Sequence, residues 1–445
     1  MPVRSAAAVA CLAASLCAPP ASAFCGFFVG KADSGLFNEA SKVVMARDGE
    51  RTTITMANDY RGSPRSFALV VPVPEVLRRE QIRVVDPAVI QRVDAYSAPR
   101  LAEYHDPDPC EVERREAAGP LSRRMMASAD ASGAGAARSL GVRVEAQYTV
   151  GEYDIVLLSA QQSDGLETWL RTNGYRIPAG AAKALAPYIR QQQKFFVARV
   201  NLGEQAKTGL VHLRPLQFSF ESPRFMLPIR LGMVNASGPQ DLVVFMLTRQ
   251  GRVETTNYRT VKLPANLDIP AWVKSDREQG FGAFYKALFD TQAKREGHRV
   301  VFTEYFWDMG WCDPCAADPL SNDELRALGA AWIPAADAPA PGVAGPQQAL
   351  LTRLHVRYTP ETFPEDLMFQ ETKDRANYQT RYVLRHAWSG NPDACPAAKA
   401  YLRAVDRRRE TEAQRLANLT GWNIEGIRAK TFGSLAGVIA PGARP

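Results

Sequence analysis

This chain has few histidines and none of the familiar catalytic motifs. Histidine accounts for 5 of the 445 residues, and no two histidines have the close spacing of a paired zinc-ligand motif. The sequence contains no Gly-x-Ser-x-Gly, no phosphate-binding loop and no His-Glu-x-x-His. These patterns mark α/β-hydrolases, P-loop proteins and zinc peptidases. Their absence argues against the common hydrolytic and nucleotide-dependent enzymes, and we expect no cofactor and no metal.

Long apolar runs are confined to the start of the chain. Arg4 precedes an apolar run from Ser5 to Ala18, and the small residues Ala21-Ser22-Ala23 follow. This pattern indicates a secretory signal peptide cleaved after Ala23. No later run approaches the roughly 20 apolar residues that a transmembrane helix needs. We therefore expect an exported protein, periplasmic or extracellular, whose mature chain has no transmembrane segment.

Charge is not segregated along the chain. The 54 basic and 47 acidic residues are interspersed and give a net charge of +7. The densest basic stretch, Arg407-Arg408-Arg409, lies among Asp406, Glu410 and Glu412, which is typical of a solvated helix face. No surface for nucleic acid is predicted.

Cysteine is unevenly placed, and its pairing is left open by the sequence. Cleavage after Ala23 removes two of the seven cysteines. The disulfide candidates that remain are Cys25, Cys110, Cys312, Cys315 and Cys395. Because their number is odd, at least one has no intrachain partner. We expect two bridges: one involves the Cys-x-x-Cys segment, and the other joins Cys25 to Cys110.

The segment Trp311-Cys312-Asp313-Pro314-Cys315 permits two interpretations. In a thiol-disulfide oxidoreductase, Cys312 would attack and Cys315 would resolve the mixed disulfide. However, the two βαβ halves of a thioredoxin fold are not visible in the sequence. A structural bridge is the default in an exported protein, either between these two cysteines or from one of them to Cys395.

A metal site is a weaker alternative for the same cysteines. Cys312, Cys315, Cys395 and one histidine would suit zinc, but the histidines show no supporting spacing. His212 and His355 lie in apolar strand patterns, so we expect them to be packed rather than ligating. We expect His105 to lie in an exposed, proline-stiffened loop.

The periodicity predicts a β-rich α+β fold with sandwich-like antiparallel sheets and a few helices. Residues 41–57 alternate around Asp48-Gly49, which is typical of a β-hairpin. The continuous apolar run Phe67–Val73 suits a strand covered on both faces, and four strands are predicted within 195–248. A helix over 179–192 should kink or end at Pro187. A long amphipathic helix is predicted over 396–419.

Composition divides the chain into seven segments. They are a signal peptide (1–23), an N-terminal β-rich lobe (24–115), a flexible loop (116–140), a central α+β lobe that ends in the Cys-x-x-Cys segment (141–332), a Pro/Ala linker (333–348), C-terminal strands with a long helix (349–432) and a disordered tail (433–445).

Long blocks of the sequence resemble one family of exported bacterial proteins, known as domain of unknown function 2330. The blocks are FCGFFVG, LFNEASKVVMARDGERTTITMANDY, FALVVPVPEVL, VDAYSAPRLAEYHDPDPC, RVETTNYRTVKLP and MGWCDPCAADPLS. The family has no established activity, so the resemblance implies no catalytic residue.

Taken together, these observations favour an exported envelope protein that acts by binding or as a structural component rather than as an enzyme. Thiol-disulfide exchange at Cys312 and Cys315 is the alternative. Candidate partners are an envelope protein, a peptide or a carbohydrate. The aromatic stretches FCGFF, EYFWDMGW and TGWNI suit either a binding groove or a packed core.

Overall fold

A computed structural model describes most of the chain. The described residues are 27–30, 37–38, 41–57, 60–61, 67–111, 144–160, 163–172, 180–208, 213–235, 238–311, 313, 319–334 and 348–433. The predicted signal peptide and flexible loop lie outside this set, as do residues 335–347 of the predicted linker and residues 434–445 of the predicted tail. Cys25, His212, Cys312 and Cys315 also lie outside it.

The fold is α+β, as predicted, and most of its strands form two sheets. The large sheet has nine strands, in the order β16 (Arg259–Lys262), β18 (Val300–Asp308), β19 (Leu350–Tyr358), β14 (Gln240–Thr248), β3 (Ser41–Asp48), β4 (Arg51–Ala57), β12 (Leu216–Glu221) and β7 (Ile82–Val84), with β21 (Tyr378–Gln379) beside β18. Most neighbours are antiparallel, but β14 runs parallel to β3, and β16 runs parallel to β18. Strands of all three predicted lobes thus interleave in one sheet.

The small sheet has five antiparallel strands. Their order is β1 (Phe27–Gly30), β6 (Phe67–Val73), β11 (Lys194–Val200), β10 (Tyr153–Ser159) and β9 (Val144–Val150). The two sheets pack face to face over one shared apolar core, so the predicted sandwich is present. The β3–β4 hairpin supplies Val43 and Ile54 to this core, and β6 supplies Leu69 and Val71.

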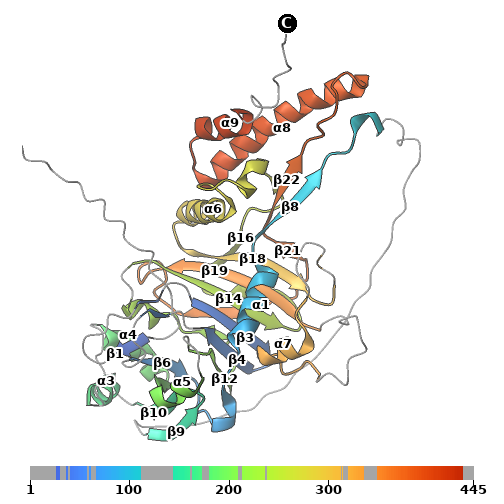
Figure 1. The fold of residues 1–445 in the computed structure, drawn as a ribbon. Coiled ribbons are helices and arrows are strands. Elements are labelled where there is room, and N and C mark those ends of the chain that lie inside the picture. Colours follow the sequence, from blue (N-terminus) through green and yellow to red (C-terminus); the bar gives the residue numbers. More distant parts are fainter. Residues whose placement is uncertain are drawn as a thin grey trace, which may run out of the picture.

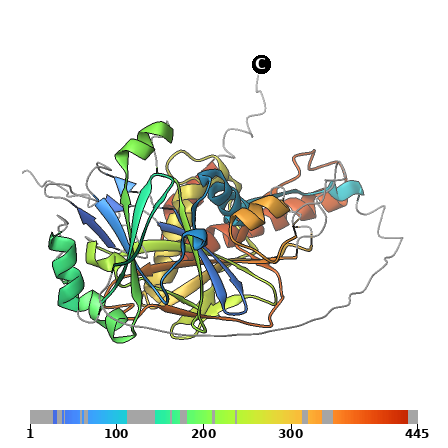
Figure 2. The same cartoon turned by 90° about the horizontal axis from the view of Figure 1, so that it is seen from below.

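Helices cover the outer face of each sheet. The outer side of β6 contributes Val70 to a second core with α3 (Ser163–Thr172) and α4 (Ala181–Arg190), which explains the uninterrupted apolar run of this strand. The large sheet is covered by α1 (Pro87–Ser97) and α7 (Asn322–Ala327). Figures 1 and 2 show these helices on the two outer sides of the sandwich.

A helical module lies at one end of the large sheet (Figure 1). It consists of α6 (Phe281–Arg295), α8 (Pro396–Thr420) and α9 (Ile424–Gly433), and its apolar core also includes Tyr382 and Leu384. A parallel three-stranded sheet connects the module to the sandwich through β17 (Leu267–Asp268), β22 (Arg381–His386) and β8 (Arg100–His105).

Short elements complete the described chain. They are β2 (Phe37–Asn38), β5 (Tyr60–Arg61), β13 (Met226–Leu227), β15 (Val253–Thr255), β20 (Leu367–Glu371), α5 (Leu202–Thr208) and the 3₁₀ helices η2 (Arg79–Gln81), η3 (Gly232–Asn235) and η4 (Ala271–Lys274). None of the helices described is long and apolar enough to cross a membrane.

One predicted element differs from the structure. Of the four strands predicted within 195–248, the third, expected over 225–235, is limited to Met226–Leu227, because Pro228 has no amide hydrogen with which to continue a ladder. The helix predicted over 179–192 is present as α4, which contains Pro187 and ends at Arg190.

The predicted Cys25–Cys110 disulfide is wrong, while a Cys312–Cys315 bridge stays a prediction because both residues lie outside the described residues. Cys110 is bonded to Cys395, directly before α8, with a Cα–Cα distance of 5.9 Å. This bond excludes the expected Cys25–Cys110 pair and any bridge from Cys312 or Cys315 to Cys395. It also removes Cys395 from the proposed zinc ligands. The bridge connects the segment that follows β8 to the start of α8 in the helical module.

We predict a large stability loss when this bridge is removed. It spans 285 residues of sequence, so replacing both Cys110 and Cys395 by serine should lower the free energy of unfolding by about 5 kcal/mol through loop-closure entropy. Urea denaturation at constant pH measures the change. Each single variant should lose as much as the double variant, because either change breaks the same bond. A loss below about 1 kcal/mol would contradict the assignment of a stabilising bridge.

Candidate functional site

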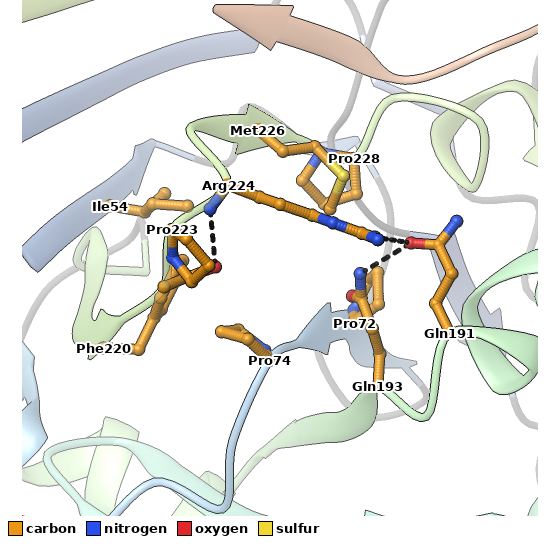
Figure 3. Close-up of a pocket in the computed structure, with 11 residues that line it drawn as sticks. Ile54, Pro72, Pro74, Gln191, Gln193, Phe220, Pro223, Arg224, Met226 and Pro228 are labelled. Atoms are coloured by element: carbon orange, nitrogen blue, oxygen red, sulfur yellow. Dashed lines mark hydrogen bonds between the residues drawn. The ribbon is translucent and has the colours of Figure 1, made fainter. Parts of the chain in front are cut away.

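A small apolar groove opens where strands leave both sheets of the sandwich. Its volume is about 180 Å³. Figure 3 shows its lining, which comes from β4, from the ends of β6 and β12, from the turn after α4 and from the segment around β13. The lining residues are Ile54, Pro72, Pro74, Gln191, Gln193, Phe220, Ser222, Pro223, Arg224, Met226 and Pro228.

The walls of the groove offer few hydrogen-bond donors. Four lining residues are prolines, which have no backbone amide hydrogen. Ile54, Phe220 and Met226 add apolar surface between them (Figure 3). Such a surface favours an apolar group and leaves the few polar side chains to orient it.

The turn after α4 places two glutamines at one end of the groove. The backbone N–H of Gln193 donates to the carbonyl oxygen of Tyr188, and the backbone N–H of Gln192 donates to that of Ile189. These are the paired bonds of a Schellman motif. Gln192 has a φ of 57°, a left-handed conformation in which glycine is usual. This turn brings Gln191 and Gln193 together on the groove side (Figure 3).

One oxygen at this end of the groove has no partner. Gln191 Oε1 accepts from Arg224 Nη1 at 2.6 Å and from Gln193 Nε2 at 3.4 Å. These contacts assign the amide orientation of Gln193, because its nitrogen must face the Gln191 oxygen. Gln193 is 6% exposed, and its Oε1 has no hydrogen-bond partner within the described part of the chain. A buried acceptor in this state is unusual.

A larger cavity of about 310 Å³ lies on the small sheet beside Trp169. Its acidic residue, Asp154, already accepts hydrogen bonds from Thr149, Arg199 and Asn201. The cavity is larger than the groove, but the carboxylate of Asp154 is already hydrogen-bonded within the protein and is not available to a ligand.

The densest cluster of charges lies on the large sheet. Strand β19 alternates, so Leu354 and Val356 enter the sandwich core while Arg353, His355 and Arg357 lie on the opposite face. An irregularity in β18 between Thr303 and Tyr305 inserts Glu304 opposite these basic residues. Its side chain is fully buried.

Glu304 is the centre of this cluster. Its Oε2 accepts from Arg353 at 2.5 Å, its Oε1 bonds His355 Nδ1 at 2.6 Å, and the hydroxyl of Tyr285 also donates to it. Burial alone would raise the pKa of Glu304, but His355 and Arg353 lower it to about 2.

The cluster continues as a chain of alternating charges on both sides of Glu304. On one side, Arg353 also binds Asp94 of α1 at 2.6 Å, and Asp94 binds Lys42 of β3 at 2.6 Å. On the other side, Asp241 lies between His355 and Arg357.

His355 is packed, as the sequence suggested, because its ring stacks on Phe289 at 3.8 Å between centroids. Burial would lower its pKa, but Glu304 and Asp241 raise it to about 9. Each charged side chain in this cluster is paired with an opposite charge, so we assign the cluster to structure rather than catalysis. Shifted pKa values mark active sites and structural networks alike. The alternation of Arg353, His355 and Arg357 within an apolar strand was the signal for it in the sequence.

Around the Cys-x-x-Cys segment, Asp313 is firmly anchored. It is 8% exposed, and its carboxylate accepts from Tyr305 at 2.9 Å and from Gln379 at 2.7 Å. Trp311 is 56% exposed. Since Cys312 and Cys315 lie outside the described residues, the redox alternative stays a prediction. The described residues contain no group of three or more His, Cys, Asp or Glu side chains that could hold a metal.

Comparison with known proteins identifies the family. The sequence profile of an uncharacterized protein conserved in bacteria (DUF2330) matches residues 19–370. The chain belongs to this family. The match includes all residues of the groove, while Cys395, α8 and α9 follow the matched segment.

Other comparisons add no functional information about this DUF2330 member. No curated protein matches it. A solved structure of a mutated baculovirus P35 after caspase cleavage is similar at 9% identity, with a TM-score of 0.26, over 47% of this chain and 66% of that chain. This chain therefore spans slightly less than two thirds of that protein, and the low score supports no argument about fold or function.

We predict that His355 makes the stability of this DUF2330 protein depend on pH. Its pKa rises from 6.5 to about 9 on folding, so its contribution is fully present below about pH 6.5 and is lost as the pH rises through about 9. The shift corresponds to roughly 3 kcal/mol. Denaturation curves between pH 6 and pH 10 measure it.

The matched variants separate His355 from other titrating groups. His355→Gln should flatten this part of the pH profile, whereas His386→Gln, which changes the partly exposed histidine beside Glu103, should leave it intact. An unchanged profile in His355→Gln would assign the effect to another residue.

Proposed function

We propose that this protein is exported and acts by binding a ligand in the proline-lined groove, without chemistry. The observation that carries the proposal is the unpartnered oxygen of Gln193 in the groove lining. Leaving a buried acceptor unsatisfied costs about 1 to 3 kcal/mol. A ligand that donates a hydrogen bond to this oxygen would offset that cost.

The composition of the groove supports binding over catalysis. Its eleven lining residues include no Asp, Glu, His, Cys, Lys or Tyr. Acid-base catalysis needs a titratable group within reach of the reacting atoms. Ser222 is the one hydroxyl in the lining, and its oxygen accepts from the backbone amide of Arg224 at 3.1 Å with no general base in the lining.

Two observations support export to the periplasm or the medium. The N-terminal pattern up to Ala23 is that of a signal peptide. The Cys110–Cys395 disulfide fits an oxidising compartment, where such bonds persist.

The groove can be tested directly through Met226, which lines it. With methionine methyl groups labelled with ¹³C, N-acetylleucine or its N-methylamide should shift the Met226 signal in a saturable way. Met246, buried in the sandwich core, should not shift. Absence of a Met226 shift with both compounds would contradict the proposal.

We predict opposite effects of Gln193→Leu on stability and binding. The variant should raise the free energy of unfolding by about 1 kcal/mol or more, because it removes an unsatisfied buried acceptor, and should abolish the Met226 shift. Gln240→Leu is the matched control, since Gln240 also has a buried Oε1 without a partner in the described residues but does not line the groove. It should keep ligand binding. Retained binding in Gln193→Leu would exclude this oxygen from the site.

Export predicts a defined mature protein. The intact mass of the protein from the periplasmic fraction or the medium should correspond to a chain that begins at Phe24, after cleavage at Ala23. Recovery of the full chain from the cytoplasm alone would contradict export and leave the groove proposal to its own test.

A further inference from the structure

The size of the groove limits its ligand to one apolar group. An apolar cavity of about 150 Å³ accommodates a benzene molecule, and the groove has about 180 Å³. A single aliphatic side chain fits this space. A drug-sized molecule, which needs a pocket of about 300 Å³ or more, does not.

The polar end adds one acceptor and one cation. Gln193 Oε1 is an acceptor without a partner in the described residues, and an N–H group of the ligand can donate to it. Arg224 is exposed and lies across one side of the groove, where the neutral amide of Gln191 holds it (Figure 3). No carboxylate of the described residues lies within ion-pair distance of Arg224; its bonded side-chain partner there is Gln191. Its guanidinium is therefore available to a ligand anion, for which its fork of donors is well suited.

The acceptor and the cation are close together. Arg224 Nη1 and Gln193 Nε2 both donate to the same oxygen of Gln191. Gln193 Oε1 belongs to the same side-chain amide as this Nε2, so the acceptor and the guanidinium lie near each other. One amino-acid residue of a ligand is therefore long enough to reach both groups.

We infer that the groove binds the C-terminal residue of a peptide that carries an aliphatic side chain. The side chain fills the apolar floor, the amide N–H donates to Gln193 Oε1, and the terminal carboxylate pairs with Arg224. This inference rests on the proposed binding function and names its ligand class.

The lining also separates a peptide end from a free amino acid with the same side chain. A free amino acid would bring an ammonium group to the neutral oxygen of Gln193. The lining has no Asp or Glu to pair with that charge, and an unpaired buried charge is costly. A peptide amide donates the same hydrogen bond without the charge.

Titrations followed at the Met226 methyl group test the inference. N-acetylleucine represents the peptide end, its N-methylamide lacks the carboxylate, and free leucine carries the ammonium group. We expect N-acetylleucine to bind at least about tenfold more tightly than either of the others, since charge-assisted hydrogen bonds are the strong ones.

Variants of Arg224 assign this preference to its guanidinium. Arg224→Gln should reduce the affinity for N-acetylleucine to that for the N-methylamide while leaving the latter unchanged within about twofold. Arg224→Lys should keep part of the preference, because it retains the charge without the fork. Arg299→Gln, at an exposed arginine that does not line the groove, should behave as wild type.

Each contrary outcome has a separate meaning. Equal affinities for N-acetylleucine and its N-methylamide, or a preference that survives Arg224→Gln, would overturn the carboxylate assignment while groove binding stands. Free leucine binding as tightly as N-acetylleucine would replace the peptide end by a free amino acid. Absence of any Met226 shift would remove the proposed function as well.

Discussion

The packing of helices α1 and α6 against the large sheet depends on the buried carboxylate of Glu304. It lies on β18, next to the edge strand β16 of the large sheet, with its side chain fully buried, and meets Arg353, His355 and Tyr285. An ion buried in this way is tolerable only with close partners, and removing one partner of a buried pair costs about 3 to 5 kcal/mol. Since those partners come from β19 and α6, and Arg353 continues to Asp94 of α1, one group of charges holds the helices in position on the sheet.

The groove depends on a different property, the way in which strands end. Pro72 and Pro74 lie at and beyond the end of β6, and Pro228 directly follows β13. Proline cannot extend a ladder, so the sheets separate there and leave apolar surface open. The left-handed conformation of Gln192 then directs its neighbours toward that opening. A left-handed glutamine and an unsatisfied acceptor thus lie side by side, and the proposed binding function would account for features that cost stability.

Local patterns were reliable where a single segment contains its own explanation. The 41–57 hairpin, the doubly covered strand of residues 67–73 and the long helix before Thr420 all follow from alternation, turn residues and helical periodicity. The packing of His355 followed from its apolar neighbours. Its ion pairs did not, because Glu304 and Asp241 lie far from it in sequence and meet it only through strand register.

The sequence by itself determined the class of fold, the main strands and helices and the membership in the family, because these depend on short-range periodicity and on long contiguous blocks. Only the tertiary structure decided the Cys110–Cys395 pairing, the order of the strands and the groove. The seven cysteines of the chain allow many pairings, and the groove residues lie in separate segments between Ile54 and Pro228. No local property of those segments indicates that they meet, because their contacts depend on how the two sheets pack.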